Sequence, residues 1–579
     1  MRYRWVIRTT AEEEESTSFD GVPAVVGYCL RARGVRDAME AGRYLEPRLE
    51  QLSDPFEFGG MWTMVSRLHA ARTRGEPVVV FGDYDVDGVT ATALLEEVLG
   101  RLGWAVSSHI PDRFSDGYGL TPESVRRCLT RHPSRLVLAV DCGANAAAFV
   151  ADLAAEGVEV LVLDHHAPGV DGLPACPCLH PATLPATDHP ARSASAVGLA
   201  FKLAHALVKE GRRLGAAAEL GYDVRPLLDL VALGTVADLV PLTGENRVLV
   251  TAGLKRLRNS GRAGLRALME LAGIDGELGV WQVGFQLGPR LNAAGRLDTA
   301  ERALELLRAR DLQEARPLAE SIEQQNRERQ ALERAVSDEA MTRLRATCDP
   351  AQDYVLVAAD AGWHLGVVGI VASRVVREFH RPALILGGEG DILRGSGRSL
   401  PGFDLAEALG ACSDLVERGG GHAMAVGCSV RAEQLDAVRE RLNLLARDRF
   451  GGAIPPLELV MDAELSLGDL SDELMEWLAK LEPTGQGNPP ARFVVRDVQL
   501  AGPLQRMGRE ASHVRFKVTD GKAWGDVVWW GGGKEVWPSG RFDLAVEPRV
   551  NDYRGRRSVQ LRMLDWQPAG QGTAGSGAR

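Results

Sequence analysis

The chain has 579 residues, 45% of them hydrophobic and 25% charged, which is typical of a globular protein with about three to five domains. No apolar stretch is long enough to span a membrane, and the basic N-terminus lacks the apolar segment of a secretory signal, so we expect a cytoplasmic protein. The net charge of −11 argues mildly against a nucleic-acid binder, although the electrostatic attraction of a charged ligand depends on where the basic groups lie.

The first part of the chain predicts a parallel sheet. Residues 1–40 are expected to be an acidic leader that runs into helices over 35–75. Beyond them, a strand followed by a helix and another strand is the pattern of a parallel sheet, and such sheets bind ligands at the carboxyl ends of their strands. The expected strands are 78–81, 136–140 and 158–163, with a helix over 89–102.

Acidic motifs follow these predicted strands directly. The run Asp83–Gly88 (DYDVDG) comes after the first strand, Asp141 after the second, and Asp164-His165-His166 after the third. Asp238 lies in a mainly helical region, 225–240. Because the carboxyl ends of parallel strands meet at one edge of a sheet, we expect these side chains to form a single site.

Carboxylates mixed with imidazoles suit Mn²⁺ or Mg²⁺. Four or five carboxylates carry too much charge for one ion, whereas two ions with a bridging carboxylate would balance it. A two-metal site can activate water and clamp both oxygens of an in-line displacement at phosphorus. Each motif alone has an ordinary alternative: a solvated or calcium-binding turn, a structural histidine pair, or an Asp141 that caps a helix. Together they predict a two-metal phosphoesterase.

The rest of the chain predicts two further units. A long, charged helical segment over 301–347 is expected to connect the first unit to a second α/β unit. That unit has expected strands at 354–357 and 383–386, a helix at 366–379, and a Gly-rich turn before His422. From about residue 455, short strands separated by turns indicate a small β-barrel.

The motifs match, in order, those of the DHH phosphoesterase family, which is named after the Asp164-His165-His166 triplet. The chain resembles in particular the single-strand-specific exonucleases of this family, through residues 111–120, 288–297, 397–399 and 420–422 as well. The resemblance implies an α/β fold class, with two α/β domains joined by a long helix and followed by an OB-fold barrel. The expected divisions are a leader at 1–40, a DHH domain at 41–300, the connecting helix at 301–347, a DHHA1 domain at 348–450, the OB-fold at 451–567 and a flexible tail at 568–579.

The resemblance also implies roles for the site residues. Asp141 would bridge the two ions, Asp164 would orient an imidazole rather than bind metal, and His166 would contact the scissile phosphate or support the leaving oxygen. Which ion each remaining carboxylate serves stays open. The expected metal ligands are Asp83, Asp85, Asp87, Asp141, His165 and Asp238, and the expected catalytic residues are Asp85, Asp87, Asp141, His165, His166 and Asp238.

A single-stranded substrate requires cations for its phosphates and aromatic faces for its bases. The Gly-rich turn before His422 would in addition bring backbone N–H groups close to an anion. For several of these side chains the alternative is a buried aromatic anchor or a salt bridge between domains. The expected DNA contacts are Arg113, Phe114, Tyr118, Arg290, Arg296, Ser373, Arg374, Arg398, Ser399, His422, Gln486 and Asn488.

The function implied by the resemblance is degradation of single-stranded DNA from its 5′ end to 5′ mononucleotides, in recombination and repair. The implied cofactors are two divalent ions, Mn²⁺ or Mg²⁺. The implied partners are single-stranded DNA with a 5′ end, a single-strand-binding protein and a RecQ-type helicase, at the nucleoid and without a membrane.

Two rival functions remain. The first is a related enzyme acting on short oligonucleotides, cyclic dinucleotides or pyrophosphate, against which the additional barrel argues. The second is a non-catalytic DNA-binding scaffold of the same fold, against which the complete ligand set argues.

Overall fold

The computed structural model describes residues 3–8, 19–112, 119–388, 390–553, 556–570 and 574–575. Its first large unit contains a five-stranded, all-parallel sheet in the order β3-β2-β4-β5-β6. Every residue of β2 and β4 is buried, as expected for central strands covered on both faces. The prediction of a parallel sheet is confirmed. The strands are β2 (Val78–Phe81), β3 (Val106–His109), β4 (Leu136–Val140), β5 (Glu159–Leu163) and β6 (Cys178–Leu179).

Apolar faces of the surrounding helices form one core with this sheet. Helix α3 ends where the sequence predicts, at Gly75 with φ 62°, after Arg72 and Arg74 in its last turn. The packed helices include α3 (Met61–Arg74), α4 (Val86–Arg101), α7 (Ala196–Arg213), α9 (Leu228–Ala237) and α10 (Gly244–Arg258).

The connecting segment differs from the expected single helix over 301–347. It consists of α14 (Glu301–Arg308) and the 36-residue α15 (Leu312–Thr347). The break is set by Asp311, whose side chain accepts hydrogen bonds from the backbone N–H groups of Gln313 and Glu314 and so starts a new helix. Helix α13 (Gly288–Leu297) precedes this pair and packs against α15.

The second α/β unit has a mixed five-stranded sheet in the order β10-β11-β9-β8-β7. The Gly-rich run that was expected to form a turn belongs instead to strand β10, which pairs in antiparallel fashion with β11. The expectation of a turn before His422 is therefore wrong, because these residues form an edge strand, whereas contact with an anion there stays a prediction. The elements are β7 (Leu356–Ala359), α16 (Leu365–Phe379), β8 (Ala383–Gly387), β9 (Ile392–Arg398), β10 (Val416–His422), β11 (Ala425–Arg431) and α18 (Leu435–Arg449).

The third unit is the predicted barrel. Strand β14 pairs with both β18 and β16, and this double pairing closes a ring through β19 and β17. The alternating apolar residues of these strands fill its core. The strands are β14 (Phe493–Leu500), β15 (Gln505–Met507), β16 (His513–Thr519), β17 (Trp524–Trp529), β18 (Arg541–Tyr553) and β19 (Arg556–Pro568).

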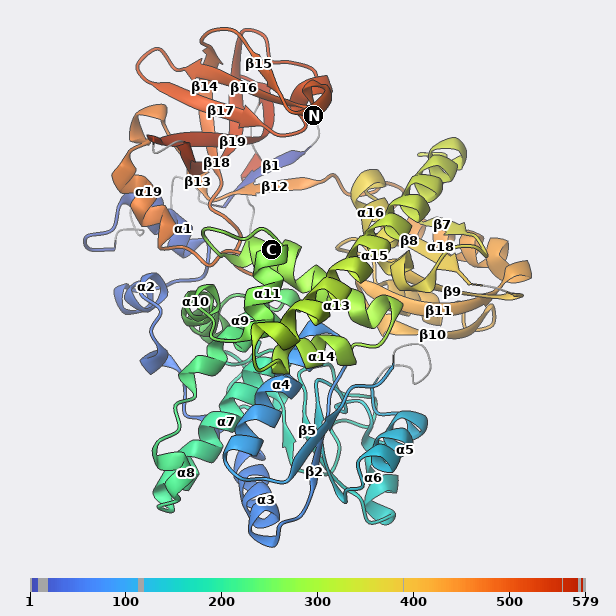
Figure 1. Ribbon diagram of the computed structural model, residues 1–579. Helices are drawn as coiled ribbons and strands as arrows, with labels where there is room; N and C mark the ends of the chain where they lie inside the picture. Colours follow the sequence, from blue (N-terminus) through green and yellow to red (C-terminus); the bar gives the residue numbers. More distant parts are fainter. Residues whose placement is uncertain are drawn as a thin grey trace.

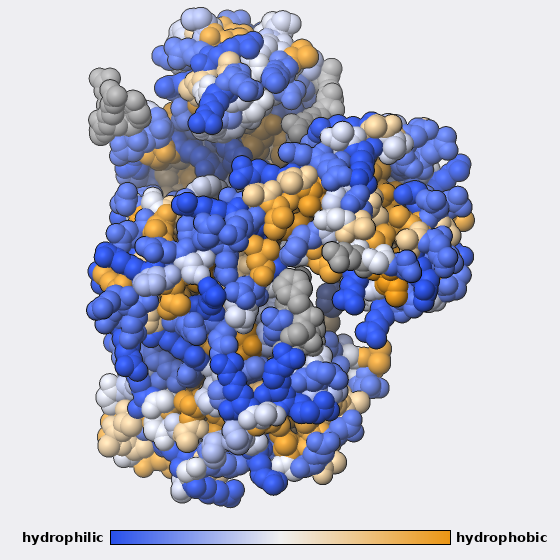
Figure 2. Space-filling model, turned by 45° about the vertical axis from the view of Figure 1, so that its right-hand side comes forward, coloured by the Kyte–Doolittle hydropathy of each residue, from blue (hydrophilic) through white to orange (hydrophobic). Residues whose placement is uncertain are grey.

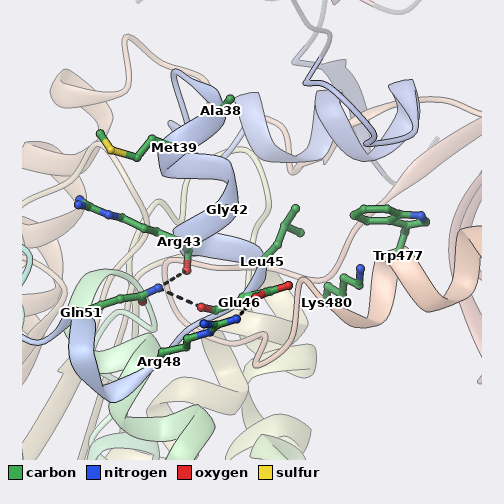
Figure 3. A pocket seen from close by; sticks show the side chains of 10 residues that line it. All are labelled: Ala38, Met39, Gly42, Arg43, Leu45, Glu46, Arg48, Gln51, Trp477 and Lys480. Atoms are coloured by element: carbon green, nitrogen blue, oxygen red, sulfur yellow. Dashed lines mark hydrogen bonds and ion pairs between the residues drawn. The ribbon is translucent and has the colours of Figure 1, made fainter.

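Parts of the expected leader are built into this third unit. Strand β1 (Arg4–Ile7) pairs in parallel with β12 (Glu458–Met461), and α1 (Ala24–Arg31) contributes to the barrel core. A groove of about 460 Å³ lies between α2 (Ala38–Leu45) and α19 (Asp472–Ala479) (Figure 3). None of the residues that line this groove belongs to the acidic motifs.

The three units are arranged around the central helices (Figure 1). The parallel sheet lies at the bottom, the second α/β unit at the right and the barrel at the top, with α15 running toward the right-hand unit. On the face shown in Figure 2, apolar side chains gather near the centre, where the three units meet. Among the described helices, none combines the length and the apolar character required to cross a bilayer.

Candidate metal centre

The acidic motifs do meet at the carboxyl edge of the parallel sheet. The structure brings their oxygen and nitrogen atoms into three overlapping groups, each with ligand atoms within 4.8 Å of one another. Asp141 belongs to two of the groups, and His165 also belongs to two. The groups are Asp83, Asp85 and Asp141; Asp87, His165 and Asp238; and Asp141, His165 and His166.

The acidic turn after β2 is held by its own backbone. The side chain of Asp85 accepts hydrogen bonds from the N–H groups of Asp87 and Gly88 and thereby caps α4. Gly88 is required here because a Cβ atom would lie 2.6–2.8 Å from the backbone of Asp83. The three aspartates of this run thus lie where strand β2 ends and the chain turns directly into helix α4.

Asp87 connects this turn to a helix more than one hundred residues away. Its two carboxylate oxygens accept hydrogen bonds from the N–H groups of Ala196 (2.7 Å) and Val197 (2.9 Å), the first residues of α7. The first backbone N–H groups of a helix have no partner within it, and an anion there is stabilised by the helix dipole. Burial, followed by the charge of Asp85, nevertheless raises the pKa of Asp87 to about 7.

Several buried atoms of the site have no hydrogen-bond partner among the residues that the structure describes. They are Oδ1 of Asp83, both carboxylate oxygens of Asp141, and Nε2 of His165. Asp141 is 1% exposed and adopts the left-handed conformation, with φ 63°. An unpaired buried carboxylate is very unfavourable, so these donor atoms fit divalent cations that would neutralise and coordinate them.

The protonation of the two histidines differs because of their surroundings. Burial, followed by the nearby His166, lowers the pKa of His165 to about 4, which leaves a neutral imidazole suited to metal coordination. Its Nε2 lies 3.3 Å from Asp141 Oδ1 and 3.5 Å from Asp238 Oδ2. Burial also disfavours the charged form of His166, but the hydrogen bond and charge of Asp164 outweigh it and raise the pKa to about 9.

Asp164 connects the loop after β4 to the loop after β5. It is 1% exposed and accepts hydrogen bonds from the N–H groups of Ala144, His165 and His166. Its Oδ1 also lies 2.8 Å from His166 Nδ1. Although burial alone would raise the pKa of Asp164, these contacts with His166 and the backbone lower it.

The carboxylates strongly raise one another's pKa values. Burial, followed by the charge of Asp85, raises the pKa of Asp141 well above its ordinary value, and the same two causes act on Asp83. Burial, followed by the charge of Asp87, raises the pKa of Asp238 to about 9. Such shifts are typical of functional sites, where like charges are held together.

Helix α13 supports the acidic turn, and its contributing residue was missed from sequence. Asn292 Oδ1 accepts a hydrogen bond from the N–H group of Val86 (3.2 Å). Gly295 packs so closely on Tyr84 that a Cβ atom would lie 2.8 Å from the Tyr84 carbonyl oxygen. The motif over 288–297 was expected to contribute two arginines to DNA binding, whereas the contact of Asn292 with the acidic turn has no local sequence signal.

Of the expected DNA contacts, Arg113, Phe114 and Tyr118 lie outside the described residues. The two arginines of α13 make contacts within the protein. Arg290 forms a salt bridge with Glu323 of α15 (2.7 Å), and Arg296 donates to the carbonyl oxygen of Gly366 at the start of α16 (3.3 Å).

The expected contacts in the second α/β unit also have partners within the protein. Arg374 on α16 forms a salt bridge with Glu333, and Ser373 donates to the Gly369 carbonyl oxygen. Arg398 donates to the side chain of Ser396 (2.9 Å), while His422 is exposed at the end of β10.

Two of the expected contacts are buried and hydrogen-bonded within the protein. Ser399 is 5% exposed and donates its hydroxyl hydrogen to the Phe403 carbonyl oxygen. Asn488 is fully buried and makes four hydrogen bonds, with Arg33, Tyr44 and the carbonyl oxygens of Leu481 and Pro483. Neither side chain can reach a substrate without breaking these bonds. In contrast, the side chain of Gln486 in the same segment is exposed.

Three family models match the chain. They are the N-terminal domain of the DHH family over residues 77–235, the DHHA1 domain over residues 352–448 and the RecJ OB domain over residues 461–565. Each range falls on one of the three units, and the first contains Asp83–Gly88, Asp141 and the histidine pair.

Similar proteins cover almost the entire chain. The single-stranded-DNA-specific exonuclease RecJ of Dickeya dadantii is 37% identical over 96% of this chain and 97% of its own length. The protein of that name from Bacillus subtilis is 36% identical over 97% of this chain and 71% of its own length.

Solved structures show the same architecture. RecJ from Thermus thermophilus in complex with Mn²⁺ has a TM-score of 0.83 and 32% identity, covering 98% of this chain and 80% of the other. A structure of that protein with Mg²⁺ has a TM-score of 0.77 and 30% identity, covering 98% and 79% of the two chains.

Proposed function

This chain belongs to the RecJ family of DHH phosphoesterases, and on that premise we propose that it is a metal-dependent exonuclease that degrades single-stranded DNA from the 5′ end. The observation that carries the proposal is the cluster at the carboxyl edge of the sheet, in which buried atoms of Asp83, Asp141 and His165 have no hydrogen-bond partner in the described part of the chain. Holding several like charges together is energetically unfavourable, and such clusters are typical of functional sites, here one suited to cations and a phosphate.

We propose that the site holds two divalent ions, Mn²⁺ or Mg²⁺. Asp141 is the bridging ligand in this proposal, because its oxygens take part in two of the overlapping groups. When bound, the ions would lower the pKa of a water molecule and neutralise charge that develops on the phosphoryl oxygens. The proposed ligands are Asp83, Asp85, Asp87, Asp141, His165 and Asp238.

The protein's own contribution to the chemistry centres on His166. In the metal-free protein its pKa is about 9, which favours a protonated ring, and 31% of its side chain is exposed. Asp164 engages Nδ1, so we propose that Nε2 donates to the scissile phosphate and supports the departing oxygen. The backbone bonds of Asp164 fix the orientation of the ring, so that no reorientation is needed during the reaction.

The second α/β unit would hold the phosphates next to the scissile one. Arg296 bonds to the first turn of α16, which places α16 and its Arg374 on the side of α13 that also supports the acidic turn. In the proposal, phosphate oxygens replace Glu333 and Ser396 as partners of Arg374 and Arg398. Exposed His422 would contribute in the same way.

The barrel would hold the strand upstream through the outer face of β16 and β17. Trp524 at the start of β17 and Trp530 directly after its end are 66% and 56% exposed. The neighbouring strand contributes Lys517 and Arg515 to the same face, where Arg515 forms a salt bridge with Asp526 of β17. Exposed indole rings among cations are suited to stacked bases and phosphates, and this is the ligand face of OB-folds.

Release of 5′ mononucleotides, a role in recombination and repair, and work alongside a single-strand-binding protein and a RecQ-type helicase complete the proposal. These further points rest on the family resemblance.

An end-label assay tests the proposal. Purified protein is incubated with Mn²⁺ and single-stranded DNA labelled at either the 5′ or the 3′ end, together with a blunt duplex. We expect immediate release of the 5′ label as a mononucleotide, progressive shortening of the 3′-labelled strand, and slow loss of the duplex. Shortening from the 3′ end alone, or activity confined to dinucleotides, would overturn the proposal.

The matched control is Asp141→Ala. Because Asp141 would bridge the ions, we expect this variant to lose at least about 10³-fold in rate, which corresponds to about 4 kcal/mol of transition-state stabilisation. Binding of single-stranded DNA should persist, since the phosphate and base contacts lie elsewhere. Unchanged activity would refute the bridging role.

A further inference from the structure

The chain immediately after Asp238 exposes apolar surface beside the metal centre. Leu239 follows this carboxylate directly, has φ 61° and is 70% exposed. Left-handed backbone is unfavourable for leucine and recurs at functional sites. Its side chain therefore points mostly to solvent at a position where the backbone conformation is also strained.

The segment that packs on the same helix end carries an aromatic pair. Trp281 of α12 (Val280–Gln282) and Phe285 of the following π-helical turn (Val283–Leu287) have ring centroids 5.8 Å apart and an interplanar angle of 26°. They are 59% and 70% exposed, although aromatic side chains usually bury most of their surface. Single π-turns within helices are frequent at functional sites.

Two glycines of the segment that carries the pair contact the end of α9. A Cβ atom on Gly284 would lie 3.9 Å from the Val236 side chain, and one on Gly288 would lie 3.3 Å from Ala237. Val236 and Ala237 are the last residues of α9, directly before Asp238. The exposed aromatic faces are thus attached to the helix that carries the carboxylate.

We propose that the Trp281–Phe285 pair, together with Leu239, is a base-binding platform at the rim of the metal centre, and that it takes unstacked bases of single-stranded DNA next to the scissile phosphate. The proposal rests on the proposed nuclease function and adds a subsite to it. The segment 280–288 carries no charged side chain, so it suits the faces of bases rather than phosphates.

Such a platform would favour single strands over duplexes. In a duplex the bases are already stacked on one another, and their faces are available to a protein only after unstacking and unpairing. A single strand can instead place a base on the indole or phenyl ring without this cost. The apolar rim would therefore add selectivity at the point where the strand enters the metal centre.

A double-mutant cycle with abasic DNA tests the platform. Binding is measured by fluorescence anisotropy in the Asp141→Ala background, with and without Trp281→Ala plus Phe285→Ala. The probes are a single-stranded oligonucleotide and versions with one abasic site at successive positions from the 5′ end. We expect the double substitution to raise the Kd of intact DNA roughly tenfold and to have little further effect on DNA that is abasic at the bound position.

The chain offers a matched control for this substitution. Phe56 and Trp62 form another stacked pair, with centroids 4.0 Å apart, and Trp62 is 51% exposed on α3. Trp62→Ala should leave DNA affinity unchanged. Trp281→Phe should retain most of the affinity, because an aromatic face remains.

The outcomes separate the platform from the proposed function. If the wild-type protein does not degrade single-stranded DNA, the proposed function fails. If it does, and the double variant binds as tightly as its parent or loses equally on intact and abasic DNA, the platform fails alone. A change in sedimentation of the double variant without a change in DNA affinity would assign the pair to a protein contact and overturn the platform.

Discussion

Asp238 and His166 illustrate how burial and mutual charge make the site dependent on cations. Both keep a proton in the folded, metal-free protein at neutral pH, with pKa values of about 9. Burial and the charge of Asp87 raise the pKa of Asp238. Burial alone would lower the pKa of His166, but Asp164 raises it. Metal ions would displace the proton from Asp238 and compensate the charge that it then carries.

We therefore expect the metal-free protein to lose stability as the pH rises from about 6.5 to 9. An unfolded chain releases the Asp238 proton near pH 4 and the His166 proton near pH 6.5, so in this window only the folded state retains both protons. Raising the pH through the folded-state pKa values removes that advantage. Below pH 6.5, the lowered pKa of His165 acts in the opposite direction, because the unfolded chain gains its proton first.

The measurement is the melting temperature followed by circular dichroism between pH 6.5 and 9, with a chelator or with Mn²⁺. The melting temperature should fall with pH only in the chelated sample. Asp238→Asn should flatten that decline, since the amide does not titrate. A flat profile in the chelated wild-type protein would contradict the electrostatic description of the site.

At the scale of elements, the segment 484–488 joins the barrel to the catalytic unit. The Gln486 carbonyl oxygen accepts from the N–H group of Leu242, and a Cβ atom on Gly487 would lie 2.9 Å from Pro241. Beside it, Asn488 bonds to both Arg33 and Tyr44 of the N-terminal segment. The segment was expected to touch DNA, but much of it holds the units together.

We expect Asn488→Ala to lower the free energy of unfolding by about 3 kcal/mol, because it leaves buried donors and acceptors unpaired. DNA affinity of the folded protein should not change. Gln486→Ala is the matched control, since the exposed side chain of Gln486 can be removed at a cost of roughly 0.5 kcal/mol or less. Denaturant unfolding and anisotropy measure the two quantities, and a stable Asn488→Ala variant that binds DNA weakly would contradict this assignment.

At the scale of the whole molecule, the proposed function divides the contacts with a long substrate among the three units. The metal centre lies at one sheet edge, and the barrel offers the exposed indoles of Trp524 and Trp530 on a separate unit (Figure 1). A short oligonucleotide that fills the metal centre need not reach this barrel face. The contribution of the barrel should therefore grow with the length of the strand.

We expect Trp524→Ala with Trp530→Ala to weaken binding of long single strands by at least about thirtyfold and to leave the shortest ones unaffected, because each of the two stacked bases contributes about 1–3 kcal/mol. Lys517→Ala should also reduce the slope of log K against log salt by about 0.7. Lys480→Ala is a suitable control, since Lys480 lies over the ring of Trp477 beside the groove in Figure 3. Equal losses for all strand lengths would exclude the upstream role.

Much of the architecture could be predicted from local patterns. Apolar runs followed by Asp83, Asp141 and Asp164 indicated central parallel strands, and the rule that ligands bind at strand ends then grouped the motifs. The barrel was recognisable from short alternating strands. The glycines before His422 were misassigned, because a run of glycines favours turns locally while its pairing partner, β11, follows only after the chain reverses.

The sequence by itself determined the acidic donor set, the parallel sheet and the barrel, because each depends on periodicity or on residues close together in the chain. Only the tertiary structure decided which polar side chains are free for a substrate. Asn488 and Ser399 are buried by segments distant in sequence, and Asp87 is bonded to the start of α7. The segment that carries the exposed Trp281–Phe285 pair is likewise placed near Asp238 by its contacts with α9. Such long-range contacts leave no local pattern in the sequence.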